Sequence, residues 1–319
     1  MQWEAAPLEG VTNDIWRRCQ GRLFAPADRY YTPFLSPTAS RHFTHRELNE
    51  ILPEHNEGLT VIPQLIGHDA EDFLWAAGEL RAMGYREVNL NLGCPSGTVT
   101  AKKKGAGLLG EPALLTRLLD GIFDRTPVAV SIKTRIGLQS PDEWEALLRL
   151  FERYPLCELI VHARTRDQQY RGAPHIAAWE LAENTSSLPL CYNGDLFDRP
   201  SAESFASAHP QARSAMLGRG LIANPNLIGE LRGGPALTRE ALQIFHDELY
   251  AACRERIVYE KPLLLHMKEL WFYLGCCLDG ADRPLKLLRK SRTAAEYESA
   301  VRSLFTACPV RPAAGFRPS

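Results

Sequence analysis

The chain has 319 residues, 45% of them hydrophobic, and a formal net charge of -1. This length can bury a large core and predicts two domains, or one barrel with an appendage. This net charge excludes a global basic field that would attract nucleic acid. The charge is unevenly distributed: residues 236–319 carry 13 basic and 10 acidic side chains (+3), and the remaining residues carry 24 basic and 28 acidic side chains (-4).

Strand-like and helix-like segments alternate along the first 235 residues. The expected strands are residues 3–7, 29–31, 60–66, 87–92, 128–134, 158–163, 188–193 and 214–218. Amphipathic stretches at 70–83, 111–123 and 141–154 predict helices, the last with a capping box from Ser140 to Glu143. Eight strand–helix units in about 230 residues predict an α/β fold, the (β/α)8 TIM barrel. The alternative is a doubly wound sheet, but no GxGxxG follows the first strand.

A different pattern begins after Gly233-Gly234-Pro235, where residues 238–257, 263–274, 284–290 and 293–304 predict helices with no strand between them. The expected organisation is a catalytic barrel at 1–235 and a helical domain at 236–308. The proline-rich residues 309–319 are expected to form a disordered tail.

Polar residues stand at the carboxyl ends of at least six successive strands. They are Gln64, Asn91, Lys133, Arg135, His162, Arg164, Asn193, Asp195 and Arg219. One such residue would mean little, but barrel enzymes place their active sites at this face. The set therefore predicts a shared mouth.

Cys94 lies in the turn that follows the fourth strand, just before a glycine-containing loop at 105–109. A nucleophilic cysteine needs a lowered pKa and usually a neighbouring base. A general acid needs its proton, which an ordinary thiol retains at neutral pH. No sequence-local histidine accompanies Cys94, which favours the acid; a small buried turn residue is the third possibility.

Two turns, 193–195 and 218–220, follow the last two strands and predict a phosphate-bearing cofactor, with Arg219 as a permanent cation. Each could also be an ordinary strand-to-helix turn. Lys133, with His162 and Gln64 on neighbouring strands, could stabilise negative charge on a reduced cofactor or an enolate-like oxygen. The alternative is a surface lysine and a core histidine.

Two basic segments could bind a large anionic substrate, or could simply be solvated. One is Lys102-Lys103-Lys104 beside Cys94. The other is helical and contains Arg283, Lys286, Arg289, Lys290 and Arg292.

Several further classes of protein are disfavoured by the sequence. No HExxH, P-loop or Cys/His cluster appears, so no metal is expected. Eight cysteines without a CxxC pair indicate free thiols in a reducing cytoplasm. Neither a signal peptide nor a membrane-spanning run is visible.

The chain resembles the bacterial tRNA-dihydrouridine synthases nearly end to end. The motifs that carry the resemblance are Ala6-Pro7-Leu8-Glu9-Gly10-Val11-Thr12, Pro63-Gln64-Leu65-Ile66-Gly67, Asn91-Leu92-Gly93-Cys94-Pro95-Ser96, Ile132-Lys133-Thr134-Arg135-Ile136-Gly137, Val161-His162-Ala163-Arg164-Thr165, Tyr192-Asn193-Gly194-Asp195, and Gly218-Arg219-Gly220 with Asn224-Pro225. The cysteine motif and its glycine-rich continuation are specific to this family, whereas the others are partly shared with wider FMN-binding barrels.

The resemblance implies tightly bound FMN, NADPH or NADH as reductant, and reduction of the C5=C6 bond of uridines in tRNA. Cys94 would protonate C5, while Asn91 would help seat the base and Arg135 would meet the substrate. The implied flavin residues are Pro7, Leu8, Glu9, Gln64, Lys133, His162, Asn193, Gly194, Asp195, Gly218 and Arg219. The implied tRNA-binding residues are Lys102, Lys103, Lys104, Lys268, Arg283, Lys286, Arg289 and Lys290.

The sequence departs from the family pattern at Leu8, where methionine is usual, and in the lysine-rich loop 102–107. The helical domain matches loosely, at residues 266–270, so the modified position stays open. A monomer is expected. The rival hypotheses are a flavin-dependent pyrimidine or dihydroorotate oxidoreductase that acts on small molecules, and a non-catalytic RNA-binding module.

Overall fold

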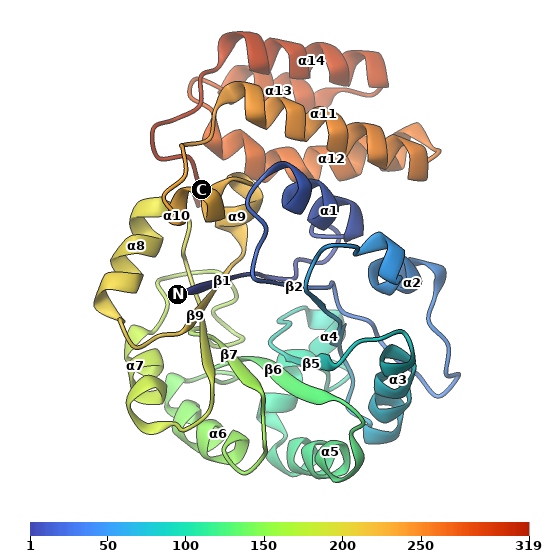
Figure 1. Ribbon diagram of the computed structural model, residues 1–319, viewed down its shortest axis with the longest axis vertical. Helices are drawn as coiled ribbons and strands as arrows, with labels where there is room; N and C mark the ends of the chain where they lie inside the picture. The colour runs from blue at the N-terminus through green and yellow to red at the C-terminus, as the bar shows by residue number, and fades with distance from the viewer. Residues whose placement is uncertain (319) are drawn as a thin grey trace. The chain divides into compact units, whose positions relative to one another are not determined.

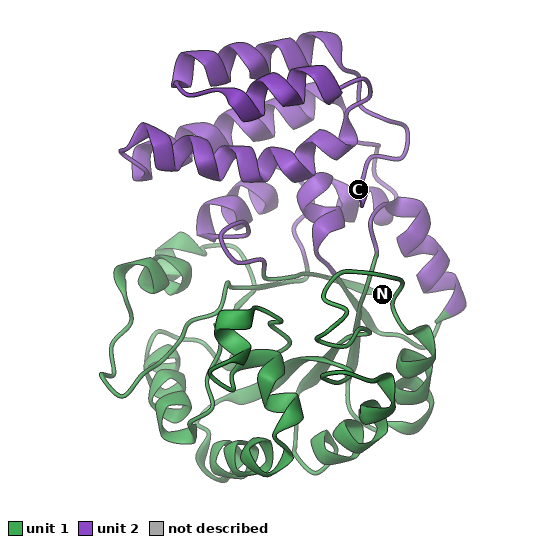
Figure 2. Ribbon diagram, turned by 180° about the vertical axis from the view of Figure 1, so that it is seen from behind, with its two compact units in different colours: residues 1–7, 28–195, 209–216 green, residues 8–27, 196–208, 217–319 purple. Residues whose placement is uncertain are grey.

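The computed structural model describes residues 1–318, which form two compact units (Figures 1 and 2). Unit 1 comprises Met1–Pro7, Asp28–Asp195 and His209–Met216. Unit 2 comprises Leu8–Ala27, Leu196–Ala208 and the chain from Leu217 onward. Each unit draws on separate stretches of sequence, so the division differs from the boundary expected at residue 235.

Unit 1 is built on a nine-stranded sheet in the order β3-β2-β1-β9-β8-β7-β6-β5-β4. The strands are β1 (Gln2–Ala5), β2 (Arg29–Tyr31), β3 (Val61–Ile62), β4 (Gln64–Leu65), β5 (Glu87–Leu92), β6 (Ala129–Arg135), β7 (Glu158–His162), β8 (Leu190–Asn193) and β9 (Ser214–Leu217).

The sheet closes on itself because its two ends, β3 and β4, are separated in the chain only by Pro63. Proline has no backbone N–H, so it interrupts strand pairing at this point. The pairings β1–β2, β2–β3 and β4 through β9 are parallel. Counted as one interrupted strand, β3 and β4 complete the eight strands that the sequence predicts, and the TIM barrel is confirmed.

The helices of unit 1 surround the strands (Figure 1). They are α2 (His45–Ile51), α3 (Ala70–Ala82), α4 (Gly97–Thr100), α5 (Pro112–Arg125), α6 (Trp144–Phe151) and α7 (Ile176–Thr185), with 3-10 turns at Pro53–His55, Gly105–Gly110 and Pro141–Glu143. The capping box of Ser140 and Glu143 is confirmed, although it opens the short 3-10 turn that precedes α6.

Unit 2 is helical. Its helices are α1 (Asp14–Leu23), α8 (Arg199–Ala208), α9 (Arg219–Ala223), α10 (Leu227–Leu231), α11 (Arg239–Arg256), α12 (Glu260–Leu274), α13 (Asp282–Lys290) and α14 (Ala294–Ala307), with a 3-10 turn at Gly275–Cys277. The last four α-helices correspond to those expected from the sequence. In the described part of the chain, no helix is long and apolar enough to cross a membrane.

An ion pair explains why α1, which follows the first strand in the chain, belongs to unit 2. The carboxylate of Asp14, on α1, is buried and lies 2.5 Å from the guanidinium of Arg256, on α11. Arg22 and Glu248 make a second ion pair between the same two helices. Buried charges require such partners, so α1 is fixed to α11 by charge as well as by packing.

Residues 309–318 are ordered, in contrast to the tail that their composition predicts. Val310 pairs with Leu278 in an antiparallel bridge, and Ala314 and Phe316 are buried. A proline-rich composition describes the average behaviour of a tail, whereas the buried side chains of Ala314 and Phe316 anchor this one. The expected tail also includes Ser319, which lies outside the described residues.

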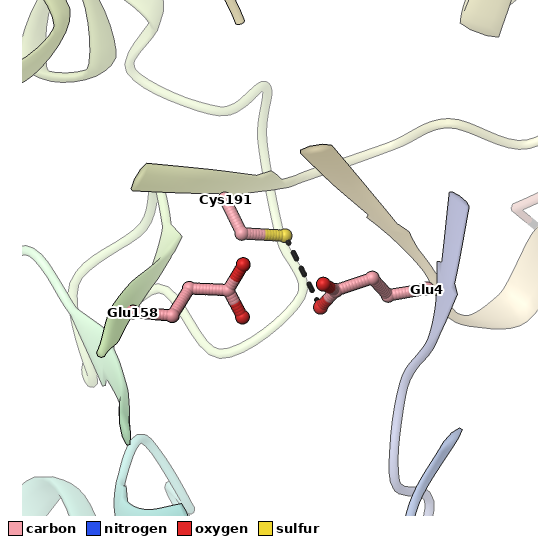
Figure 3. A group of neighbouring side chains, drawn as sticks. All are labelled: Glu4, Glu158 and Cys191. Carbon is pink, nitrogen blue, oxygen red and sulfur yellow. Dashed lines mark hydrogen bonds between the residues drawn. The ribbon is translucent and has the colours of Figure 1, made fainter. Parts of the chain in front are cut away.

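The amino-terminal ends of the barrel strands enclose a second set of buried charges. Glu4 and Glu158 point toward one another beside Cys191 (Figure 3), and the thiol of Cys191 donates to Glu4 Oε2 at 3.5 Å. These three are, among the described residues, the group that offers metal-ligand atoms in close proximity. Arg29 supplies positive charge here: its Nη1 donates to Glu158 Oε2 at 2.9 Å.

Burial, reinforced by the negative charge of Glu158, raises the pKa of Glu4 to about 8. Glu4 is 0% exposed, and its Oε1 atom accepts no hydrogen bond. Arg29 Nη1 lies 3.7 Å from this atom and favours the ionised form, but burial and the charge of Glu158 outweigh it, so Glu4 keeps its proton at neutral pH.

Replacing Glu4 with glutamine should flatten the pH dependence of stability. Because its folded-state pKa exceeds the unfolded value of 4.5, the stability contributed by protonated Glu4 is complete below that value and is lost as the pH rises toward 8. Glutamine stays neutral, so relative to wild type the Glu4→Gln variant should gain about 4 kcal/mol of unfolding free energy between pH 5 and pH 8.5. Urea unfolding at both pH values measures the difference.

The surface variant Glu152→Gln removes the same charge without burial and serves as the control. Parallel pH profiles for wild type and Glu4→Gln would contradict the raised pKa.

Candidate active site

The parallel register brings the expected polar residues to one rim of unit 1. Asn91 on β5 is in register with Lys133 on β6. His162 on β7 is in register with both Arg135 on β6 and Asn193 on β8. The carboxyl ends of parallel strands meet at the same face of a barrel, so the members of the predicted set on β5, β6, β7 and β8 share one rim of unit 1, whereas Arg219 belongs to unit 2.

Lys133 and Asn193 form a polar pair at this rim. The Nζ atom of Lys133 donates to Asn193 Oδ1 at 2.7 Å, and Asn193 Nδ2 donates to the carbonyl of Met216 at 2.9 Å. Burial, together with the positive charge of Arg135, lowers the pKa of Lys133 to about 7. A negative group bound beside Lys133 would restore its charge, so this position favours an anionic ligand.

Asn91 organises the turn that carries Cys94. Its side-chain oxygen accepts from the backbone N–H groups of Gly93 at 3.0 Å and Cys94 at 2.9 Å. Its amide nitrogen donates to Gln64 Oε1 at 2.6 Å, and Gln64 in turn donates to Asn89 Oδ1 at 2.8 Å. In this series of hydrogen bonds, the side-chain amides of Asn91 and Gln64 are each oriented by a neighbouring group. The network therefore holds the Cys94 turn in a defined conformation.

The thiol of Cys94 is half-buried and retains its proton. Burial raises the pKa of Cys94, while a hydrogen bond from the backbone of Ser96 and the charge of Arg135 act in the opposite direction. The group is therefore an acid at neutral pH that has stabilising partners for its conjugate base.

The glycine-containing loop closes tightly over Cys94. Gly105 has φ +55°, and a Cβ at this position would lie 2.9 Å from the carbonyl oxygen of Cys94 and 3.1 Å from its Cβ. The backbone N–H of Ala106 donates to the same carbonyl at 3.1 Å. The glycine pattern noted in the sequence thus has a packing reason, because no side chain fits there.

Arg135 has a different environment from the substrate contact expected of it. It is 1% exposed, and its guanidinium donates to the carbonyls of Gly93, Thr165 and Gln169, each at 2.8 Å. These bonds tie the Cys94 turn to the loop that follows β7. These hydrogen bonds favour a positioning role for Arg135, whose charge acts on the Cys94 thiol through space.

Two residues in the loop after β7 have contacts that the sequence pattern did not indicate. Arg164, noted there only as a strand-end residue, is buried and binds both carboxylate oxygens of Asp195, with Nη1 to Oδ1 at 2.8 Å. Tyr170 is 52% exposed, with its ring 6.1 Å from the ring of His162. A lone aromatic in an irregular loop has no periodicity, so no sequence signal identified it.

The lysine run beside Cys94 is divided among different partners. Lys103 pairs with Glu111 at 2.8 Å, and Lys104 donates to Ser36 Oγ at 3.3 Å. Lys102 is exposed. The run is thus a loop with separate contacts and not one uniform cationic surface.

The remaining expected site residues are distributed between the units. Pro7 and Gly194 belong to unit 1, whereas Leu8, Glu9, Gly218 and Arg219 belong to unit 2. Within unit 2, Arg219 lies over two aromatic rings, 4.9 Å from the centroid of Phe197 and 5.0 Å from that of Phe316.

The expected basic surface of unit 2 is present on α13. Its exposed members are Arg283, Lys286, Arg289 and Lys290, and the neighbouring Arg292 is exposed as well. Lys268 lies elsewhere: it is half-buried on α12 and donates to the carbonyl of Ser291. The ammonium group of Lys268 therefore makes a hydrogen bond within unit 2.

Comparison with known proteins places the chain in a family. The sequence model of the dihydrouridine synthase family, described as "Dihydrouridine synthase (Dus)", matches residues 4–259. A "Probable tRNA-dihydrouridine synthase" from Staphylococcus aureus (strain COL) is 29% identical over 232 residues, covering 69% of this chain and 68% of that protein. The "tRNA-dihydrouridine(16) synthase" of Neisseria meningitidis is 25% identical over 312 residues, covering 94% and 92%.

Solved structures agree on the fold alone. A variant of NCR from Zymomonas mobilis superposes with a TM-score of 0.50 at 16% identity, covering 74% of this chain and 88% of that one. A 2-naphthoyl-CoA reductase superposes with a TM-score of 0.54 at 10% identity, covering 73% and 50%. Since the family match spans most of the sequence, the chain belongs to the dihydrouridine synthase family of flavin-dependent oxidoreductases.

Proposed function

We propose that this protein is an FMN-dependent synthase that reduces the C5=C6 bond of a uridine in tRNA, with NADPH or NADH as the source of electrons. The observation that carries the proposal is the environment of Cys94. Its thiol is half-buried and protonated, and it stands on a turn fixed by Asn91 at the same rim as Lys133. An RNA-binding module without catalysis would need none of this organisation.

Saturating a carbon–carbon double bond requires a hydride at one carbon and a proton at the other. The bound FMN would supply the hydride, since that chemistry belongs to the cofactor. Cys94 would supply the proton to C5 of the base. Loss of that proton leaves a thiolate, which the Ser96 backbone and the charge of Arg135 stabilise. The Ser96 backbone and Arg135, which both act to lower the pKa of Cys94, would therefore also lower the barrier to proton transfer.

The residues of the rim fit a flavin. Gln64, Lys133 and His162 offer the polar contacts that a flavin ring would need at its edge. Asn193, Gly194, Asp195, Gly218 and Arg219 would hold the ribityl chain and phosphate, with Pro7, Leu8 and Glu9 beside the ring. Lys133 is the most telling, because a cation with a pKa lowered to about 7 gains charge when an anionic group binds next to it.

Recognition of tRNA would depend on the helical domain, residues 236–308, and on the loop 102–104. The exposed basic residues of α13 would bind phosphates, a contact that carries affinity but no sequence information. The target uridine would have to leave the RNA stack to reach Cys94, as bases do in other enzymes that act on them. The name of the Neisseria relative makes position 16 the first to test.

Substitution of Cys94 by alanine should reduce dihydrouridine formation by roughly 10²- to 10⁴-fold, which is the usual contribution of a positioned general acid. Flavin content and the reduction of the flavin by NADPH should not change, because neither requires this proton. Dihydrouridine is measured in tRNA from a synthase-deletion strain incubated with the purified protein.

Cys276→Ala removes a half-buried thiol from unit 2 and is the matched control, which should keep wild-type activity. Full activity in Cys94→Ala would rule out the acid role. Efficient reduction of free uracil without tRNA would instead favour a small-molecule pyrimidine reductase.

Reversing three charges on α13, in Lys286→Glu, Arg289→Glu and Lys290→Glu, should weaken tRNA binding by about 10- to 100-fold at moderate salt. The steepness of the plot of log affinity against log salt concentration should also fall, by about three units. Each of the three lost cations would otherwise neutralise one phosphate and release its counterion. Filter binding over a range of salt concentrations measures both effects.

The matched control carries the same change of charge on the outer barrel helices, in Arg81→Glu, Arg117→Glu and Arg149→Glu, all exposed. Equal losses of affinity in both triple variants would show a general charge effect and remove α13 from the proposed binding surface.

A further inference from the structure

The carboxyl-terminal segment of the chain, residues 309–318, is fastened along unit 2 by backbone hydrogen bonds. Asp279 donates from its N–H to the carbonyl of Pro309 at 2.9 Å, and Arg311 donates likewise to Cys277 at 2.8 Å. These bonds flank the bridge between Leu278 and Val310. The segment therefore follows one fixed path from its first residue.

The segment next reaches the stretch of chain before α8. The N–H of Phe316 donates to the carbonyl of Phe197 at 3.0 Å, and Asn224 Nδ2 donates to the carbonyl of Ala314 at 3.1 Å. A Cβ at Gly315 would lie only 2.3 Å from the Phe197 oxygen, so glycine is required for this approach. These backbone contacts at Ala314, Gly315 and Phe316 thus fix the position of the Phe316 side chain.

That residue, Phe316, is 5% exposed and lies at the centre of an aromatic cluster. Its ring is 5.3 Å from that of Phe197, 6.0 Å from Phe272 and 5.8 Å from Tyr273. The guanidinium of Arg219 lies over both Phe316 and Phe197, at 5.0 and 4.9 Å. Phe272 and Tyr273 pack on Phe316 within the same cluster.

We propose that the carboxyl-terminal segment is part of the phosphate-binding apparatus, in which Phe316 acts as a positioning residue that fixes the Arg219 guanidinium for the cofactor phosphate. The proposal rests on the FMN-dependent function proposed above. Two ring contacts restrict the guanidinium of Arg219, whose planar set of N–H donors suits a phosphate. A side chain held in advance loses less entropy when its ligand binds.

The test compares FMN with riboflavin, which has the same ring and ribityl chain but no phosphate. Full-length protein freed of flavin is titrated with each ligand by fluorescence. In Phe316→Leu, which stays apolar but loses the ring, affinity for FMN should fall roughly 2- to 30-fold, the range of one cation–π contact, while affinity for riboflavin stays unchanged. Phe316→Tyr keeps the ring and should restore FMN binding.

Arg219→Met should reduce the preference for FMN over riboflavin at least as much as Phe316→Leu does, and adding Phe316→Leu to it should cause no further loss, because the two residues act on one contact. Phe272→Leu is the matched control: it removes a ring that packs on Phe316 and keeps the Phe197 and Phe316 rings that lie against Arg219, so the preference should remain.

Three results would overturn the proposal in different ways. Equal weakening of FMN and riboflavin in Phe316→Leu would make the segment a structural support only. An unchanged preference in Arg219→Met would show that Arg219 does not bind the phosphate, whatever holds the arginine. A wild-type protein that binds neither ligand would reject the flavin-dependent function itself.

Discussion

Closure of the parallel sheet is the constraint on which the rest of unit 1 depends. The two edges of the sheet are β3 and β4, which are pieces of one strand on either side of Pro63. Once they are joined, residues distant in sequence share a rim, as Asn91 and Lys133 do on β5 and β6. A register shift of one residue would turn the side chains of a strand to the opposite face, so the chemistry of the rim requires this pairing.

The same closure separates two polar centres of opposite electrostatic character. At the amino-terminal ends of the strands, acidic groups outnumber the cation Arg29, and Glu4 remains neutral by keeping its proton. At the carboxyl ends, Lys133 has Asn193 as its hydrogen-bond partner, and its charge is disfavoured by burial and by Arg135. In the first centre, Arg29 and the proton on Glu4 offset the negative charge within the fold. In the second centre, a bound anion would stabilise the charged form of Lys133, as is typical of a binding site.

The sequence predicted most of this arrangement because its signals were local. A short apolar strand followed by a polar residue could be recognised at each turn of the barrel, and the spacing of Ser140 and Glu143 was enough to predict a capping box. Contacts between distant residues could not be predicted in this way. Nothing near Arg135 in the sequence indicates that three carbonyls surround its guanidinium. Similarly, proline-rich composition at 309–318 concealed Phe316, whose partners lie far away in the chain.

The environment of Cys94 also bears on the choice between nucleophile and acid. A nucleophile needs the thiolate in the resting state, which burial opposes here. A general acid needs the proton in the resting state and a stabilised anion once the proton has been transferred. The turn supplies both: burial preserves the proton, while Ser96 and Arg135 favour the anion. Arg135 is itself held by the backbone carbonyls of Gly93 and Thr165, so its charge acts on the thiol from a defined position. Burial therefore favours the acid over the nucleophile, and Arg135 stabilises the anion that proton transfer would leave.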